Sequence, residues 1–218
     1  MHSISKNLIS ISLLSIALGF TSPAFAHKHA MHTDTILAND KISLTDAALR
    51  DLWIGHAFWV RAVVTETMNG NSVAAAVAEK ETVNNAKQLA ASIEPFYGKA
   101  ASETLFKLLA GHYTAVKGYL IATQNKNETR QNETRQDMID NVEQIAAFLS
   151  KANPNLPIDA LRGMLLAHGG HHIQQIQQVA NQQYAEEAQT WEAMKTHMVG
   201  IADALTVALA KQFPAQFK

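Results

Sequence analysis

The sequence predicts an all-α protein, a helical bundle of about six helices built from three αα-hairpins that repeat every 56 residues. The first observation is a recurring apolar helical phrase that ends in a histidine, and its three copies end at His56, His112 and His168. The second is that helical signals dominate the chain and strand signals are nearly absent. Because the histidine column keeps its period without a gap, the sequence indicates a triplicated unit.

A second column supports the same period. It follows each histidine after 29 residues and is occupied by Asn85, Asn141 and His197. Two columns that agree without an insertion define three repeats, at about residues 43–98, 99–154 and 155–210. Each repeat is long enough for two helices joined by a short turn.

Capping and breaking residues give the helix boundaries of the first hairpin. Ser43 or Thr45 can cap a helix that runs to about Met68, where Asn69-Gly70-Asn71 interrupts the pattern. A second helix is predicted from Ser72 to Ile93, ended by Pro95 and Gly98.

The second and third hairpins follow the same plan. Helices are predicted over residues 102–122 and up to about Lys151, with the duplicated Asn-Glu-Thr-Arg-Gln segment, residues 127–136, as the polar tip between them. Asn153-Pro154-Asn155-Leu156-Pro157 is the clearest break in the chain. Two further helices are predicted over residues 158–184 and 186–212.

Residues 1–26 have the features of a secretory signal peptide. Lys6 precedes an apolar run from Leu8 to Phe20, and Ala24-Phe25-Ala26 forms a cleavage site. We therefore predict a periplasmic or secreted protein with a flexible histidine-containing segment at residues 27–42 and one bundle domain at residues 43–218. After cleavage we expect no membrane span, because no later stretch reaches about 18 uncharged apolar residues.

Composition excludes several functional classes. The chain carries 18 basic and 19 acidic residues, a balance that argues against nucleic acid as a partner. It has no cysteine, which excludes disulfides, thiolate catalysis and cysteine-ligated zinc. A metal would have to be held by imidazoles and carboxylates. The sequence says nothing about a protein partner.

Both columns lie on the apolar face of their predicted helices, and unpartnered imidazoles or carboxamides in a core cost about 1 to 3 kcal/mol each. Three arrangements would satisfy them. Each hairpin could carry an internal hydrogen bond from histidine to asparagine, with a purely structural role. The histidines could instead converge and bind zinc or copper. They could also surround a small organic ligand or a catalytic centre.

The third repeat favours the metal. It has His172 where the first two repeats have Val60 and Val116, and His197 where they have asparagine. His168 and His172 are four residues apart on one helix face, a spacing suited to binding one ion. We expect these two as ligands, with His56, His112 or His197 completing the set.

The predicted mature N-terminus offers a separate copper site. Cleavage after Ala26 leaves His27-Lys28-His29, whose free amine, two amides and the imidazole of His29 suit a square-planar Cu(II) ion. The alternative is a polar tail whose histidines bind nothing.

Segments of the sequence resemble two groups of known proteins. Ile93-Glu94-Pro95-Phe96-Tyr97-Gly98, Leu108-Leu109-x-x-His112 and the terminal Gln212-Phe213-Pro214-Ala215-Gln216-Phe217 resemble a family of functionally uncharacterised, all-helical bacterial proteins. That resemblance implies a helical bundle and no particular activity. Ala167-His168-Gly169-Gly170-His171-His172-Ile173-Gln174 is similar to the metal-binding segment of DinB and YfiT-like four-helix proteins.

The second resemblance implies an alternative function. It makes His168 and His172 ligands, with His56 or His112 as the third, in a metal-dependent enzyme of the hydrolase or thiol transferase type. The residues themselves carry no catalytic motif, so the first expectation is a metal-binding or structural protein rather than an enzyme.

Overall fold

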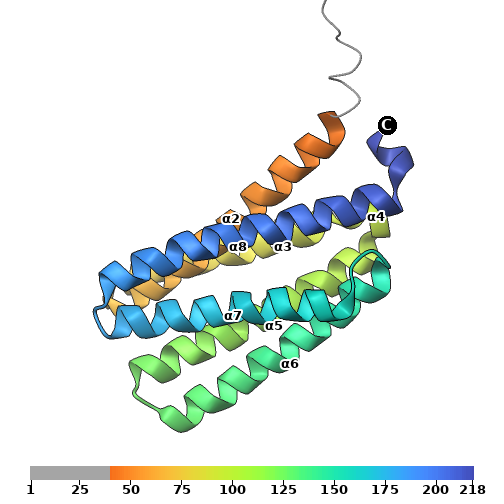
Figure 1. The fold of residues 1–218 in the computed structure, drawn as a ribbon. Helices are drawn as coiled ribbons and strands as arrows, with labels where there is room; N and C mark the ends of the chain where they lie inside the picture. The colour runs from red at the N-terminus through yellow and green to blue at the C-terminus, as the bar shows by residue number, and fades with distance from the viewer. Residues whose placement is uncertain (1–39) are drawn as a thin grey trace, which may run out of the picture. The chain divides into compact units, whose positions relative to one another are not determined.

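The computed structural model describes residues 40–218, and every regular element in that part of the chain is a helix (Figure 1). The six long helices are α2 (Asp40–Met68), α3 (Ser72–Ser92), α5 (Lys99–Gln124), α6 (Glu128–Ala152), α7 (Ile158–Ala180) and α8 (Tyr184–Gln212). A short helix, α4 (Glu94–Tyr97), connects α3 to α5, and a 3-10 helix, η1 (Pro214–Phe217), ends the chain. The all-α prediction is confirmed for these residues. The predicted signal peptide lies outside them.

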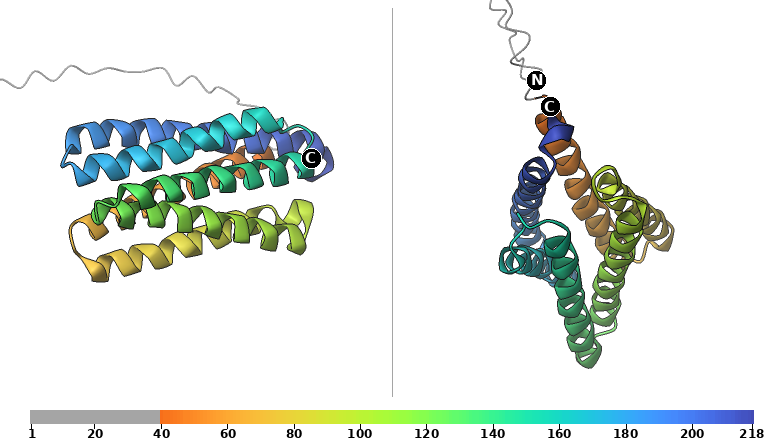
Figure 2. Two further views of the ribbon diagram at one scale, coloured as in Figure 1. Left: turned by 90° about the horizontal axis from the view of Figure 1, so that it is seen from below. Right: turned by 90° about the vertical axis from the view of Figure 1, so that its right-hand side faces the viewer.

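The long helices pack as three hairpins that close into a ring. Within the hairpins α2 packs on α3, α5 on α6, and α7 on α8. Between hairpins α3 packs on α5, α6 on α7, and α8 returns to α2, while α7 also contacts α2 and α5 (Figure 2). The first helices of the hairpins therefore face a shared interior, and the last helix contacts the first instead of leaving an open stack.

The turn between α5 and α6 differs from the prediction. The duplicated Asn-Glu-Thr-Arg-Gln segment was expected to form the hairpin tip, but α6 already begins at Glu128 and includes nearly all of it. The side chain of Asn127 caps the helix by accepting a hydrogen bond from the backbone N–H of Arg130. Arg130 also pairs with Glu133 one turn further on. The polar sequence is thus the solvent-facing start of a helix.

Other boundaries shift by a few residues. Helix α2 begins at Asp40, before its expected start, and α5 extends to Lys99 and Gln124 at its two ends. The segment that carries Pro95 forms α4, because proline is compatible with the first turn of a helix. Helix α7 ends at Ala180, earlier than expected.

The apolar core lies on both sides of the histidine column. In α2, Leu49 and Trp53 belong to one buried cluster, and Val60 and Val64, beyond His56, belong to another. Helix α5 repeats this arrangement, with Leu105 and Leu109 in the first cluster and Val116 and Leu120 in the second. The histidines therefore occupy a polar layer between two apolar regions.

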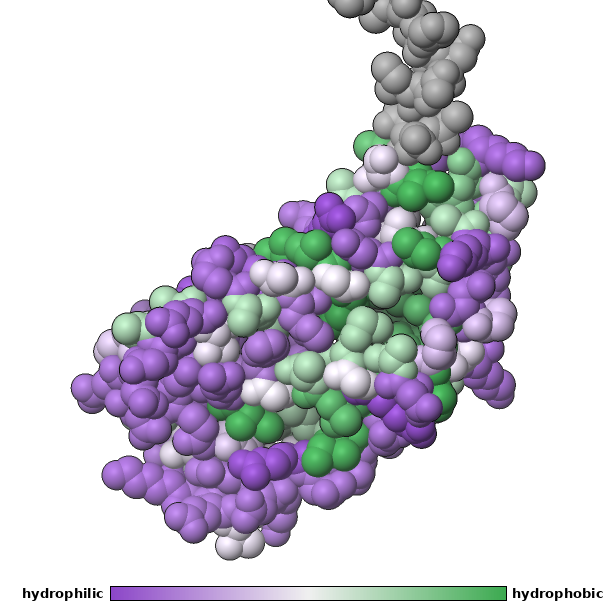
Figure 3. All heavy atoms as spheres, viewed as in Figure 1, coloured by the Kyte–Doolittle hydropathy of each residue, from purple (hydrophilic) through white to green (hydrophobic). Residues whose placement is uncertain are grey.

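The surface is mixed in character. On the face shown in Figure 3, hydrophilic side chains dominate the end where α7 turns into α8, and hydrophobic ones are interspersed toward the other end. Exposed large apolar residues on these two helices are Leu166, Tyr184 and Val207. Scattered exposed side chains of this kind are ordinary in a folded protein. Among the described helices, none combines the length and apolarity needed to cross a membrane.

Candidate metal centre

Four histidines meet inside the ring. His56 comes from α2, His112 from α5, and His168 and His172 from α7. Each offers one ring nitrogen, and these four atoms all lie within 4.8 Å of one another. Within residues 40–218, no carboxylate belongs to this group. The arrangement joins parts of the chain that are far apart in sequence.

The four rings are arranged as the corners of a rough tetrahedron. The ring centroids of His56, His112 and His168 are separated by 6.2, 5.5 and 5.3 Å. His172 lies 5.9 Å from both His56 and His112 and 4.4 Å from His168. In a tetrahedral zinc site, bonds of about 2.0–2.1 Å place the ligand nitrogens about 3.3 Å apart. The Nε2 atoms of His168 and His172 are already 3.1 Å apart.

All four imidazoles are buried, with 1 to 4% of their surface exposed. Burial, and to a smaller extent the neighbouring His112, lowers the pKa of His56 from 6.5 to about 3. Burial likewise lowers the pKa of His112 to about 4. The pKa values of His168 and His172 fall well below 6.5, first through burial and then through the other imidazoles. The rings are therefore neutral at physiological pH, and each keeps a lone pair for a metal.

Several nitrogens of this group have no hydrogen-bond partner. They are Nδ1 of His56, both nitrogens of His112 and Nδ1 of His168. Leaving a buried polar atom unpaired costs about 1 to 3 kcal/mol. A polar layer whose only purpose was structural would be expected to satisfy these atoms, so their number favours a ligand that the protein alone does not supply.

The second column lies beside this layer and binds backbone carbonyls. Nδ2 of Asn85 donates to the carbonyl of Leu52 at 2.9 Å, and Nδ2 of Asn141 to that of Leu108 at 3.0 Å. Nε2 of His197 bonds to the carbonyl of Met164 at 2.8 Å. In each case the acceptor precedes the donor by 33 residues. Each accepting residue also stands four positions before a histidine of the first column.

The direct hydrogen bond from histidine to asparagine, one of the alternatives considered from the sequence, is not formed. Oδ1 of Asn85 and Oδ1 of Asn141 are buried without a partner, as is Nδ1 of His56 and of His112. Asn141 nevertheless lies close enough to raise the pKa of His112 against the larger effect of burial. Oδ1 of Asn141 is thus placed to accept from a ring N–H of His112 once that ring is fixed by a ligand.

Small residues allow the asparagines to approach so closely. A Cβ atom added at Gly55 would lie 3.2 Å from Nδ2 of Asn85, and one at Gly111 would lie 3.0 Å from Nδ2 of Asn141. Both glycines directly precede a clustered histidine. Glycine at these positions lets the carboxamides pack directly against α2 and α5.

Of the seven sequence-predicted ligands, four lie together, one lies apart from them, and two belong to a part of the chain that the structure does not describe. Both His56 and His112 join His168 and His172, where the sequence predicted only one further ligand from His56, His112 and His197. His197 lies outside the group and is bonded to Met164. His27 and His29 lie outside the described residues. The signals that located the cluster were the 56-residue period and the spacing of four between His168 and His172.

His171 received no role from the sequence. Its ring centroid lies 5.6 Å from that of His197. The two residues come from neighbouring helices, α7 and α8, and sequence spacing alone does not reveal that they are paired.

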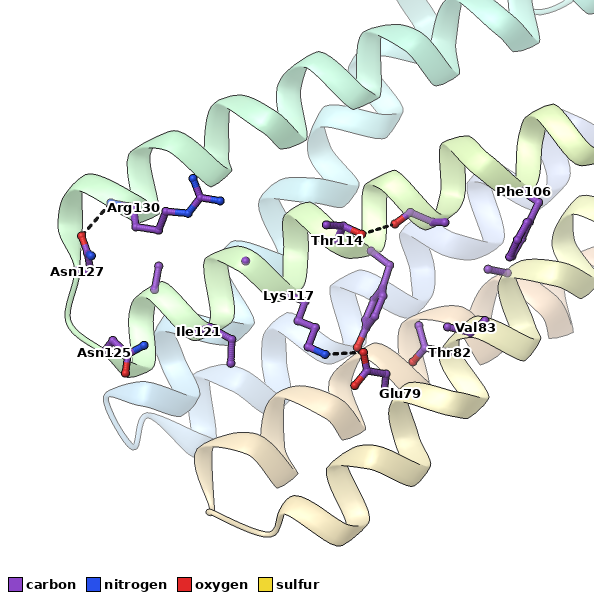
Figure 4. Close-up of a pocket in the computed structure, with 15 residues that line it drawn as sticks. Glu79, Thr82, Val83, Phe106, Thr114, Lys117, Ile121, Asn125, Asn127 and Arg130 are labelled. Carbon is purple, nitrogen blue, oxygen red and sulfur yellow. Dashed lines mark hydrogen bonds and ion pairs between the residues drawn. The ribbon is translucent and has the colours of Figure 1, made fainter.

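A separate groove with a volume of about 620 Å³ lies between α3, α5 and the start of α6 (Figure 4). Its polar groups bond mainly to one another: Lys117 pairs with Glu79, and Asn127 with the backbone of Arg130 (Figure 4). Burial raises the pKa of the Tyr113 phenol at its wall, and the negative charge of Glu79 raises it further. The groove contains no histidine. The buried cluster is therefore the better candidate for the functional site.

The chain matched no protein family, no curated protein and no solved structure with which it was compared. The two resemblances noted in the sequence therefore stay predictions. Function has to be inferred from the geometry of the site.

Proposed function

We propose that this protein binds a transition-metal ion through His56, His112, His168 and His172, and that the ion is zinc or copper. The observation that carries the proposal is the group of four buried imidazoles whose ligand atoms lie within 4.8 Å of one another. Neutral imidazole nitrogens suit both metals. An ion would also give a partner to one ring nitrogen of His112, whose two nitrogens are both buried and unpaired.

A metal held by all four histidines would have a closed, tetrahedral coordination. Structural zinc sites have four protein ligands, whereas catalytic ones keep a position for water or substrate. Burial of all four rings also keeps substrate away from the centre. These features support a structural, storage or sensing role over the metal-dependent hydrolase or transferase implied by the DinB-like segment.

We also propose that the bundle is a triplicated hairpin and that the protein is exported. The repeat is supported by the three second-column hydrogen bonds, each of which spans 33 residues. Export is supported by the signal-like residues 1–26. In a periplasmic or extracellular setting the site would take up metal from outside the cytoplasm.

Metal-dependent stabilisation of the purified chain tests the proposal. A ligand that binds only the folded state adds about 2.7 kcal/mol to the free energy of unfolding at a hundredfold excess over its Kd. We expect zinc or copper to raise the melting temperature of the metal-free protein. The matched control is His172→Val, because valine occupies the equivalent positions 60 and 116. An equal increase in this variant would place the metal elsewhere, and no increase with either metal in the unmodified chain would refute the proposal.

A further inference from the structure

Two more imidazoles lie next to the buried centre and remain accessible from outside. His171 of α7 and His197 of α8 are both only partly buried. Their ring centroids are 5.6 Å apart, within the range of 4.4 to 6.2 Å found among the four clustered rings. Neither residue belongs to the buried group.

The ring of His197 is held in the orientation that a metal ligand needs. Because a carbonyl oxygen can only accept, Nε2 carries the proton and donates it to Met164 at 2.8 Å. The lone pair is therefore on Nδ1. Histidines that bind metals almost always donate their other ring N–H to a carbonyl or carboxylate in this way. His197 is thus fixed before any ion arrives.

The position of this pair suggests what it does. The clustered rings are almost fully buried, so an ion has to pass between helices to reach them. His171 lies between two of the buried ligands on α7, directly before His172 and three residues after His168. His197 bonds to Met164, one helical turn before His168. The partly exposed pair therefore borders the helix that carries half of the buried site.

We propose that His171 and His197 form an outer metal-binding pair that captures zinc or copper and passes it to the buried centre. Water molecules complete the coordination of the captured ion. Transfer is a stepwise ligand exchange, in which the ion leaves the outer imidazoles and its waters and binds Nε2 of His168 and His172. Every ligand coordinates as a neutral imidazole, so no electron is transferred. The proton shared between Nε2 of His168 and Nε2 of His172 moves to Nδ1 of the ring that carries it as the ion binds. Transfer of the ion to the buried centre rests on the proposed function, whereas metal binding by His171 and His197 does not.

The chain itself supplies a conservative variant. Asn85 and Asn141 make the same hydrogen bond to a carbonyl 33 residues earlier that His197 makes. His197→Asn should therefore keep the contact between α7 and α8 while removing the outer imidazole. His171→Gln removes the other ring. Gln174→Ala, at an exposed position of the same helix, is the matched control.

Cobalt binding to the purified full-length chain tests the proposal, because tetrahedral Co(II) in the buried centre has a distinct visible absorption. Rapid mixing gives the rate of loading, and equilibrium titration gives the affinity and the number of ions bound. An outer pair raises the local ion concentration toward millimolar, so its loss should slow loading by about tenfold or more at micromolar cobalt. We expect both histidine variants to load slowly and to bind one ion fewer, with the affinity of the tetrahedral site unchanged. Gln174→Ala should behave like the unmodified protein.

Other outcomes separate the two proposals. If the tetrahedral band forms and both variants match the unmodified protein in rate and number of ions, the outer pair does not exist and the buried centre stands. If His197→Asn weakens the tetrahedral site as much as it slows loading, His197 supports the buried ligands and capture is refuted. If no tetrahedral band forms at all, the proposed function is wrong, and an unchanged ion count in the variants would refute the outer pair as well.

Discussion

The third hairpin differs from the first two at the positions that face the centre. Helices α2 and α5 each contribute one histidine and continue with a buried valine, Val60 or Val116. Helix α7 contributes His168 and continues with His172. Changing one apolar position of a hairpin thus turns three facing imidazoles into a set of four, at the cost of one more polar ring in the core.

The supporting residues differ in the same way. Asn85 and Asn141 pack against glycines of α2 and α5, whereas the third hairpin has Ala167 and His197 at the equivalent positions. An asparagine can donate to the carbonyl through Nδ2 and keep an acceptor, and a histidine with its proton on Nε2 offers the same pair of functions. The exchange preserves the hydrogen bond and adds a metal ligand near the surface.

The largest expected effect concerns the change of the free energy of unfolding with pH. This change shows how much His172, the extra histidine of the third hairpin, contributes. Burial lowers the folded-state pKa of the four histidines, so the unfolded chain binds protons first as the solution is acidified. Above about pH 6.5 the four histidines therefore do not lower the free energy of unfolding of the metal-free protein. As the pH drops from about 6.5 toward 4, this free energy falls by about 1.4 kcal/mol per pH unit for each histidine. Urea unfolding between pH 7 and 4 measures this slope.

The variant His172→Val, which makes the third hairpin resemble the others, should reduce that slope by about 1.4 kcal/mol per pH unit. An unchanged slope would mean that His172 does not stay neutral in the folded state.

The same variant should separate stability from metal binding. Removing His172 takes one polar ring out of the core but leaves Nε2 of His168 without its partner, so the two effects oppose each other, and we expect the stability of the metal-free protein at pH 7 to change by less than about 1 kcal/mol. Removing one of four ligands should weaken zinc binding by about a hundredfold or more, since truncating a ligand costs more than disturbing its support. Chemical denaturation and zinc titration of one preparation measure both. Unchanged zinc affinity in this variant would contradict the assignment of His172 as a ligand.

Much of the bundle could be predicted from sequence because its signals are local and repeated. The apolar spacing around His56 and His112 fixed which face of each helix is buried, and the breaks at residues 69–71 and 153–157 set the turns. The tip before α6 was misplaced because Asn-Glu-Thr-Arg-Gln is polar enough for a loop, yet Asn127 caps it into a helix.

The site was only partly predictable. Periodicity places a histidine on the inner face of its helix, but convergence depends on ring closure through the packing of α8 on α2. No local feature of the sequence indicates that α8 packs on α2. For the same reason the sequence did not distinguish His197, which bonds to Met164, from the four residues that meet at the centre.

A smaller effect should come from the asparagines of the first two hairpins. Replacing Asn141 by leucine removes the hydrogen bond to Leu108 and the unpaired oxygen beside His112. Partners that orient metal ligands usually change affinity by about 10 to 100-fold, and we expect zinc binding to weaken by that amount. Isothermal titration of Asn85→Leu, Asn141→Leu and His197→Asn compares the three hairpins. His197→Asn should keep the affinity of the buried site. Affinities of Asn85→Leu and Asn141→Leu equal to that of the unmodified protein would show that the second column serves helix packing alone.

The smallest expected effect concerns the glycines of those hairpins. The methyl group of Gly111→Ala would press on Nδ2 of Asn141, so we expect metal affinity to fall a few-fold. Folding stability should change by less than about 1 kcal/mol, because alanine favours the helix by a similar amount. Gly163→Ala, whose added Cβ meets nothing within 4 Å, is the control and should gain stability without losing affinity. Thermal melts with and without zinc measure the stability and the zinc affinity of both variants. Equal zinc affinity of Gly111→Ala and the unmodified protein would show that the added methyl group does not crowd Asn141.

Because α8 returns to α2, the centre is assembled only from a finished chain. His172 follows His56 by 116 residues, and the helix that closes the ring comes after both. A partly synthesised polypeptide therefore holds its histidines on separate hairpins, where one or two imidazoles bind an ion only weakly. Metal retention would then begin at the step at which the two ends of the domain meet, so that occupancy marks molecules whose folding is complete.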